Sequence, residues 1–171
     1  MDSKNVVLLV GGVRSGKSRL AQARAESSPG ELVFVATAQP FDAEMTERIA
    51  LHQADRGPRW RTVEEPLDVA GTLALERRED RVVVVDCLTL WLSNLMLGEH
   101  DIAAATTQLV DALAEHVGTV IIVSNEVGMG IVPENALARR FRDEAGRLNQ
   151  QVAAAANEVL LVAAGLAIRM K

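Results

Sequence analysis

One short segment constrains the fold of this chain more than any other: residues 11–18 read Gly-Gly-Val-Arg-Ser-Gly-Lys-Ser. A continuous apolar run, Val6–Val10, precedes the segment, and good helix formers at 20–25 follow it. A buried strand, a glycine-rich turn and a helix in this order direct backbone N–H groups and the positive end of a helix dipole at one point. The segment therefore predicts a phosphate-binding loop between a first strand and a first helix.

The spacing G-x-x-x-x-G-K-S also predicts what single residues do. Lys17 would neutralise charge on the β- and γ-phosphates, and the Ser18 hydroxyl would ligate Mg²⁺. The phosphate-contacting residues predicted from this loop are Gly11, Gly12, Val13, Arg14, Ser15, Gly16, Lys17 and Ser18. The alternative is an ordinary glycine turn, but the strand before the segment and the helix after it favour the phosphate loop.

Apolar runs alternate with helical segments along the rest of the chain. Further strands are expected at Leu32–Ala36, Val82–Val85, Val120–Val123 and Val159–Ala163, and helices at Leu88–Leu97, Ile102–His116 and Pro133–Ala156. The pattern predicts an α/β fold, a three-layer domain with a mostly parallel sheet that spans residues 1–171 as a single unit. Ligands of such sheets bind at the carboxyl ends of the strands.

Four other segments are less regular. We expect a helix from Asp42 to near His52, a short strand at Trp60–Glu64 and a helix over Pro66–Arg78. After a turn at Gly165, Leu166–Met170 is expected to pair beside the preceding strand as an antiparallel C-terminal strand.

Asp86 directly follows the run of four valines. In phosphate-loop proteins a carboxylate at this position holds Mg²⁺, directly or through water. An aspartate could also cap the next helix, and one residue could do both.

The composition bears on the partners and the location of the protein. A net charge of −5 among 171 residues disfavours nucleic acid and anionic membranes as partners. No segment has the roughly 18 uninterrupted apolar residues that span a bilayer, and no export signal is visible, so we expect a cytoplasmic protein. Cys87 is the only cysteine, is expected to be a small core residue, and allows no internal disulfide.

Some side chains allow both a chemical and a structural interpretation. His52 near a helix end could act chemically, although such histidines are more often structural. Four arginines between 139 and 147 alternate with acidic residues, which favours a solvated helix face over a phosphate site. Trp60 and Trp91 could stack on a base, but packing is the commoner use of tryptophan.

Several motifs together resemble one family. Besides the phosphate loop they are Ala-Thr-Ala-Gln at 36–39, Arg-Ile-Ala-Leu-His at 48–52, Trp-Arg-Thr-Val-Glu at 60–64 and Ser-Asn-Glu-Val-Gly-Met-Gly-Ile-Val-Pro-Glu at 124–134. The chain resembles the bifunctional adenosylcobinamide kinase/adenosylcobinamide-phosphate guanylyltransferases of cobalamin biosynthesis, nearly from end to end. The 124–134 segment is the most specific part of the likeness.

The resemblance implies two reactions at the phosphate loop. A nucleoside triphosphate, ATP or GTP, phosphorylates a hydroxyl of adenosylcobinamide; GTP then donates GMP to a histidine with release of pyrophosphate. The guanylyl group passes to adenosylcobinamide phosphate and gives adenosylcobinamide-GDP. His52 matches the family's histidine, and Leu51 stands where some members carry a second one. A homotrimer is also implied.

The resemblance further implies a set of nucleotide contacts outside the loop. They fall on Thr37, Ala38, Gln39, Gln53, Ala54, Asp55, Arg56, Glu64 and Asp86. Some relatives have glutamate where this chain has Asp86, whose carboxylate reaches one methylene less far.

Two other classes remain open on the residues alone. A small-metabolite or nucleoside kinase would need the phosphate loop and Asp86 but not His52. A GTP-hydrolysing switch usually carries a guanine-reading Asn-Lys-x-Asp element, and Lys4, Lys17 and Lys171, the chain's three lysines, form none.

Overall fold

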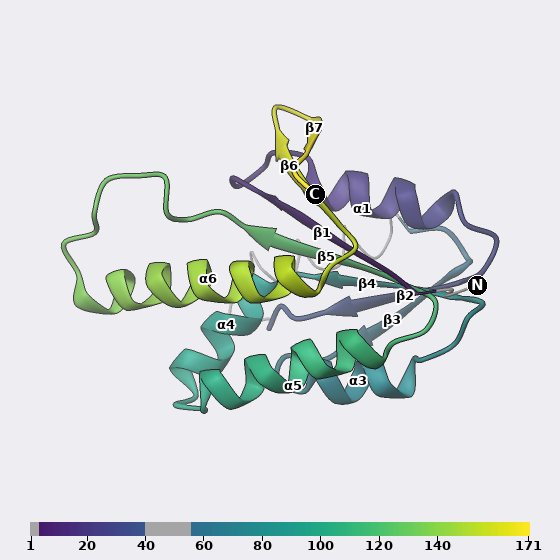
Figure 1. The fold of residues 1–171 in the computed structure, drawn as a ribbon, viewed down its shortest axis with the longest axis horizontal. Helices are drawn as coiled ribbons and strands as arrows, with labels where there is room; N and C mark the ends of the chain where they lie inside the picture. The colour runs from purple at the N-terminus through teal and green to yellow at the C-terminus, as the bar shows by residue number, and fades with distance from the viewer. Residues whose placement is uncertain (1–3, 40–55) are drawn as a thin grey trace.

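The computed structural model, which describes residues 4–39 and 56–171, contains a seven-stranded sheet in the order β3-β2-β4-β5-β1-β6-β7 (Figure 1). The strands are β1 (Asn5–Gly11), β2 (Glu31–Ala36), β3 (Trp60–Glu64), β4 (Arg81–Asp86), β5 (Thr119–Asn125), β6 (Glu158–Ala163) and β7 (Leu166–Arg169). The helices are α1 (Lys17–Glu26), α3 (Val69–Leu75), α4 (Leu88–Leu97), α5 (Ile102–Glu115) and α6 (Ala136–Ala155). All pairs are parallel except β6–β7, so the predicted α/β class and the antiparallel C-terminal strand are confirmed.

Helices cover both faces of the sheet, which gives the three predicted layers (Figure 1). On one face the core joins the sheet to Ala21 and Ala25 of α1. On the other face it joins the sheet to α3, α4, α5 and α6. The central strands are buried on both sides, which explains why their sequences read as unbroken apolar runs rather than alternating ones.

Three predicted boundaries are wrong, and local hydrogen bonds explain two of them. The helix expected at Pro66–Arg78 covers only Val69–Leu75, because the Asp68 side chain accepts a hydrogen bond from the Gly71 N–H and caps it there. The helix expected from Pro133 begins at Ala136, since the Asn135 side chain caps it. β5 continues through Ser124 and Asn125, which were expected in a loop, because Gly11 of β1 still pairs with Asn125.

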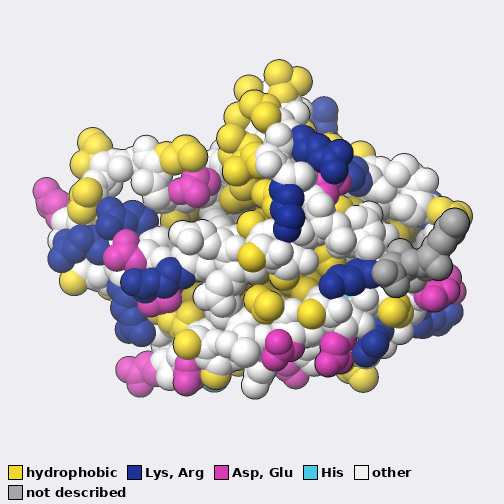
Figure 2. Space-filling view, in the orientation of Figure 1, with side chains coloured by type: hydrophobic (Ala, Val, Ile, Leu, Met, Phe, Trp, Pro, Cys, Tyr) yellow, Lys and Arg dark blue, Asp and Glu magenta, His cyan; other side chains and the backbone are white. Residues whose placement is uncertain are grey.

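Apolar side chains remain exposed on two projecting segments. They lie on the β5–α6 loop and on the C-terminal β6–β7 hairpin, which forms one side of the sheet and whose turn projects beyond the other strands in Figure 1. Both segments carry hydrophobic side chains on the surface that Figure 2 shows. On the loop they include Met129, Ile131 and Val132; on β7 and after it they are Leu166, Ile168 and Met170. Within the described part of the chain, no helix is both long enough and apolar enough to cross a membrane.

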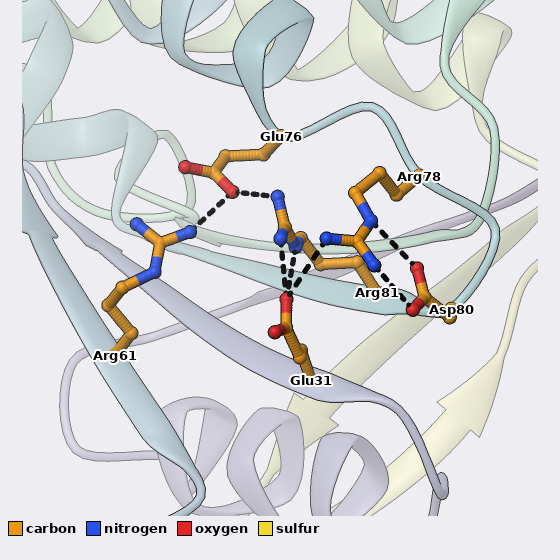
Figure 3. A network of polar contacts seen from close by, with 6 residues as sticks. All are labelled: Glu31, Arg61, Glu76, Arg78, Asp80 and Arg81. Carbon is orange, nitrogen blue, oxygen red and sulfur yellow. Dashed lines mark hydrogen bonds and ion pairs between the residues drawn. The ribbon is translucent and has the colours of Figure 1, made fainter.

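A network of ion pairs joins the amino-terminal ends of the strands (Figure 3). Arg81, the first residue of β4, pairs with Glu76 after α3 and with Glu31 at the start of β2. Glu76 also pairs with Arg61 of β3, and both the Arg81 and the Glu76 side chains are only 10% exposed. Arg78 and Asp80 form a further pair at the rim, with 52% and 61% of their side chains exposed. The network therefore contains the same kind of pair in a buried and in an exposed setting.

We predict that Arg81→Met lowers the free energy of unfolding by about 3 kcal/mol, because it leaves the buried Glu76 carboxylate without its buried partner. Arg78→Met is the matched control and should cost less than about 1 kcal/mol, since water screens both of its exposed pairs, with Asp80 and with Glu31. Urea unfolding of the two variants measures both values. Equal losses would contradict the assignment of stability to the buried pair.

Candidate active site

The loop after β1 has the geometry that its glycines predict. Gly16, the residue before α1, has a φ of 102°, which a residue with a side chain adopts only with strain. A Cβ on Gly11 would lie 2.1 Å from the carbonyl oxygen of Val162 in β6. The loop therefore needs glycine at both positions, at Gly16 for conformation and at Gly11 for space.

The β6–β7 turn supports the same loop from the side. The backbone N–H of Gly165 donates to the carbonyl oxygen of Ser15 at 2.8 Å. Two segments about 150 residues apart in the sequence are thus hydrogen-bonded, and the C-terminal hairpin takes part in shaping the candidate site.

Lys17 opens α1 with its side chain folded over the loop. The residue is 5% exposed, and its Nζ donates to the carbonyl oxygen of Gly12 at 2.5 Å and to Ser15 Oγ at 3.3 Å. Burial lowers the pKa of Lys17, and the negative charge of Asp86 opposes that shift. Both residues line the same cavity, which is described below.

Asp86 ends β4, and Thr37 fixes the backbone around it. The Thr37 hydroxyl, which is fully buried, donates to the Cys87 carbonyl oxygen at 2.7 Å and accepts from the Cys87 N–H at 2.8 Å. The Asn94 side chain of α4 donates a hydrogen bond to the Thr37 carbonyl oxygen at 2.8 Å and thus also fixes the position of Thr37. The N-cap of α4 is Cys87, without a side-chain cap, so the interpretation of Asp86 as a helix cap is wrong.

Cys87 is buried, as predicted for a core residue. Burial, with a smaller contribution from the charge of Asp86, raises the pKa of its thiol to about 11. At neutral pH the thiol stays protonated, so Cys87 is not a nucleophile.

These groups surround a cavity of about 470 Å³ at the carboxyl ends of the strands. Of the predicted site residues, Val13, Arg14, Ser15, Gly16, Lys17, Ser18, Ala38, Arg56 and Asp86 line it. Gly11 and Thr37 do not line the cavity. They are buried at the ends of β1 and β2, and Thr37 is hydrogen-bonded to the lining residue Cys87. Glu64, the exposed last residue of β3, pairs with Ala36 at the same sheet edge. Gly12 and Gln39 are likewise outside the lining.

Four predicted site residues lie outside the described part of the chain: His52, Gln53, Ala54 and Asp55. The helix expected from Asp42 to near His52 lies outside it as well.

One wall of the cavity carries an arginine stacked on an aromatic ring. The guanidinium carbon of Arg56 lies 3.7 Å from the centre of the Phe34 ring, and the Trp60 ring meets Phe34 edge-on at 6.2 Å. Burial lowers the pKa of Arg56, and Asp86 opposes the shift. The arrangement fixes a cation on the cavity wall, where it can face an anionic ligand. Trp60 and Trp91 both pack, as expected, and their indole N–H groups donate to Glu26 and to the Leu67 carbonyl oxygen.

Several residues that line the cavity were not predicted as site residues from the sequence. They are Arg19, Gln22, Phe34, Ala36, Cys87, Leu90, Val123 and Asn125. Phe34 stands in an apolar run with no alternation to show which side chain faces a ligand. Asn125 could have been found, since it is polar and directly follows a buried strand at the sheet edge where ligands bind.

The arginines of α6 lie outside the cavity lining. Arg142 pairs with Asp143 and Arg147 with Glu144, while Arg139 donates to the carbonyl oxygens of Pro133 and Glu134. Arg140 is exposed. The interpretation of a solvated helix face fits these contacts.

The fold and the loop define a P-loop nucleotide-binding protein. Among solved structures, the chain resembles the flagellar accessory protein FlaH from Methanocaldococcus jannaschii with a TM-score of 0.55 and 13% identity, covering 98% of this chain and 78% of that one. It also resembles the P4 protein of bacteriophage phi6 in complex with ADP, with a TM-score of 0.53 and 17% identity, covering 96% of this chain and 54% of the other. These likenesses show the fold.

Sequence comparison identifies the family. Residues 7–170 match the model of the cobinamide kinase/cobinamide phosphate guanyltransferase family. The chain is 46% identical over 166 residues to the bifunctional adenosylcobalamin biosynthesis protein CobP of Pseudomonas aeruginosa, covering 96% of each. It is 41% identical over 181 aligned positions to the bifunctional adenosylcobalamin biosynthesis protein CobU of Escherichia coli K12, covering 97% of this chain and 99% of the relative. The chain belongs to this family and is an enzyme with kinase and guanyltransferase activities.

We predict that Thr37→Val lowers the free energy of unfolding by about 1–3 kcal/mol, because it leaves the buried Cys87 N–H without its acceptor, while the Cys87 carbonyl oxygen keeps only the Trp91 N–H at 3.2 Å. Thr37→Ser keeps the hydroxyl and should restore most of the loss. Urea unfolding measures both variants. A valine variant as stable as wild type would show that the Thr37–Cys87 contacts do not hold the site together.

Proposed function

We propose that this enzyme phosphorylates adenosylcobinamide with ATP or GTP and then transfers GMP from GTP to adenosylcobinamide phosphate, through a guanylyl group carried on His52. The products are adenosylcobinamide-GDP and pyrophosphate. The observation that carries the proposal is the convergence of Lys17, Arg56 and Asp86 on one cavity in a chain of this family. Arg56 stands four residues after His52 in the sequence and lines that cavity.

The phosphate groups of the nucleotide would contact the loop residues 11–18, with the positive end of α1 directed at them. The residues proposed to contact the rest of the nucleotide are Thr37, Ala38, Gln39, Gln53, Ala54, Asp55, Arg56, Glu64 and Asp86. Because its hydroxyl is used by Cys87, Thr37 would act through the segment it anchors.

The candidate site fits a magnesium ion carried by the nucleotide. Ser18 and Asp86 both line the cavity and offer a hydroxyl and a carboxylate, the oxygen ligands that Mg²⁺ prefers. When bound there, Mg²⁺ would neutralise phosphate charge. Lys17, which lines the same cavity, would contribute a second positive charge.

In the first reaction, the hydroxyl oxygen of adenosylcobinamide forms a bond to the γ-phosphorus while the bond from that phosphorus to the β–γ bridging oxygen breaks. The nucleoside diphosphate leaves, and the hydroxyl proton goes to solvent. Positioning by the loop and stabilisation of charge by Lys17 are what such a transfer chiefly requires.

In the second reaction, a neutral imidazole nitrogen of His52 forms a bond to the α-phosphorus of GTP, and pyrophosphate leaves. An oxygen of adenosylcobinamide phosphate then displaces the histidine nitrogen at the same phosphorus. A covalent intermediate divides one difficult transfer into two easier ones. Histidine suits this role because its ordinary pKa lies near neutrality.

The decisive experiment follows the label from GTP labelled at the α-phosphate. Wild-type protein with Mg²⁺ should acquire acid-labile, alkali-stable label, the behaviour of a phosphoramidate, and His52→Ala should acquire none. His100→Ala, which removes an exposed histidine, is the matched control and should label like wild type. Label on the His52 variant would exclude His52 as the carrier. A wild type that binds GTP without acquiring label would support the plain kinase instead.

The proposal includes a homotrimer that works in the cytoplasm, with residues 1–171 acting as one domain. Exposed apolar side chains on the β5–α6 loop and the C-terminal hairpin support self-association, because such patches mark contact surfaces. The buried, unpaired Cys87 suits a reducing compartment.

Light scattering should give about three times the chain mass of 18.4 kDa. Ile131→Glu, at a side chain that is 97% exposed on the β5–α6 loop, should lower that mass because it adds a charge to the apolar surface. Leu75→Glu, at a leucine that is 83% exposed on α3, is the control and should leave the mass unchanged. A wild-type mass of a single chain would refute the trimer.

A further inference from the structure

Asn125 lies between the two parts of the candidate site. It is the last residue of β5, the strand between β1 and β4. Asn125 pairs with Gly11, where the phosphate loop begins, and Asp86 pairs with Val123. Because Val123 lies beside Asp86, Asn125 extends two residues, or about 7 Å, further along the strand direction, toward the edge of the sheet where the cavity lies.

The alternation of β5 shows which way the Asn125 side chain points. Ile121 and Val123 pack in the core cluster that contains α1. Ile122 packs in the cluster on the other face, and Ser124 donates to Asn149 of α6 at 2.6 Å on that face. Because side chains alternate along a strand, Asn125 faces α1 and the phosphate loop. It lines the cavity there together with Lys17 and Asp86.

Hydrogen bonds hold the backbone of Asn125 on both sides. The backbone N–H donates to Thr89 Oγ1 at 2.8 Å, and the carbonyl oxygen accepts from Asn149 Nδ2 at 3.2 Å. The side-chain amide makes no hydrogen bond to any residue in 4–39 or 56–171. A half-buried amide on a fixed backbone is suited to a ligand, since polar groups at such sites are normally paired.

The position of the amide along the phosphate chain indicates which phosphate it meets. A β-phosphate bound by the loop would lie at the amino end of α1, and the next phosphate would extend from there toward Asp86 at the end of β4, because Ser18 and Asp86 offer the oxygen ligands for the magnesium ion of the nucleotide. The path from α1 to β4 passes over the end of β5. On the basis of the nucleotide site proposed above, we propose that Nδ2 of Asn125 donates a hydrogen bond to an oxygen of the γ-phosphate. Asn125 then distinguishes a nucleoside triphosphate from a diphosphate, which lacks that group.

The test compares the binding of one GTP analogue with that of one GDP analogue. Both analogues carry a methylene group in place of the α–β bridging oxygen. Neither analogue can donate its nucleotidyl group, so calorimetry with Mg²⁺ and without corrinoid measures binding alone. Asn125→Ala should weaken binding of the triphosphate analogue about 10-fold or more, the effect of one hydrogen bond to a charged group. Binding of the diphosphate analogue should change less than about 2-fold.

Asn125→Asp has the same shape, removes the donor and places a negative charge beside the phosphate, so its loss for the triphosphate should be at least as large. Circular dichroism and thermal unfolding establish that each variant is folded. Equal losses for both analogues, or none for the triphosphate, would overturn the role of Asn125. If wild type acquires label from GTP as proposed but Asn125→Ala keeps its affinity for the triphosphate, only this inference fails. If wild type binds neither analogue, the proposed nucleotide site fails with it.

Discussion

The parallel register of β2, β4, β5 and β1 is the constraint on which the candidate site depends. Because these strands run in one direction, their carboxyl ends meet at one edge of the sheet. Asp86, Asn125 and the phosphate loop come together there although they are far apart in the sequence. Side-chain packing on both faces of these strands holds the register, because a shift by one residue would move every side chain to the core on the opposite face. At the other edge, the Arg81 network joins the amino ends of the same strands.

The site needs support beyond the strand register, because the backbone conformation of its phosphate loop is energetically unfavourable by itself. Gly16 has a backbone conformation that favours glycine, and Gly11 must approach the backbone of Val162 closely. The Gly165 N–H holds the Ser15 carbonyl, and Thr37 pairs with both backbone groups of Cys87. These contacts come from β6–β7 and β2, outside the loop and outside β4. The rigidity of the site is therefore a property of the whole sheet.

The sequence predicted the parts of this structure that depend on local chemistry. Buried parallel strands require continuous apolar runs, so β1, β2, β4, β5 and β6 could be located, and the loop was visible from its glycines and Lys17. Helix starts were less predictable, because Asp68 and Asn135 override the nearby prolines through single side-chain hydrogen bonds. Contacts such as Gly165 to Ser15, or Arg56 on Phe34, depend on how distant segments meet and leave no local pattern.

Charge explains how an acidic protein can offer a site for a polyphosphate. The chain carries a net charge of −5, which by itself would repel a nucleotide. Within the described residues, however, the cavity is lined by Arg14, Lys17, Arg19 and Arg56 against the single carboxylate of Asp86. Burial of Lys17 and Arg56 reduces the screening of their charges by water, so their attraction for an anion is stronger than at the surface. Both proposed transfers move negative charge between phosphorus and a leaving group, and a rigid cluster of cations can stabilise that charge at either the γ- or the α-phosphate. One cavity with this charge distribution can therefore serve two transfers that differ in which phosphorus is attacked.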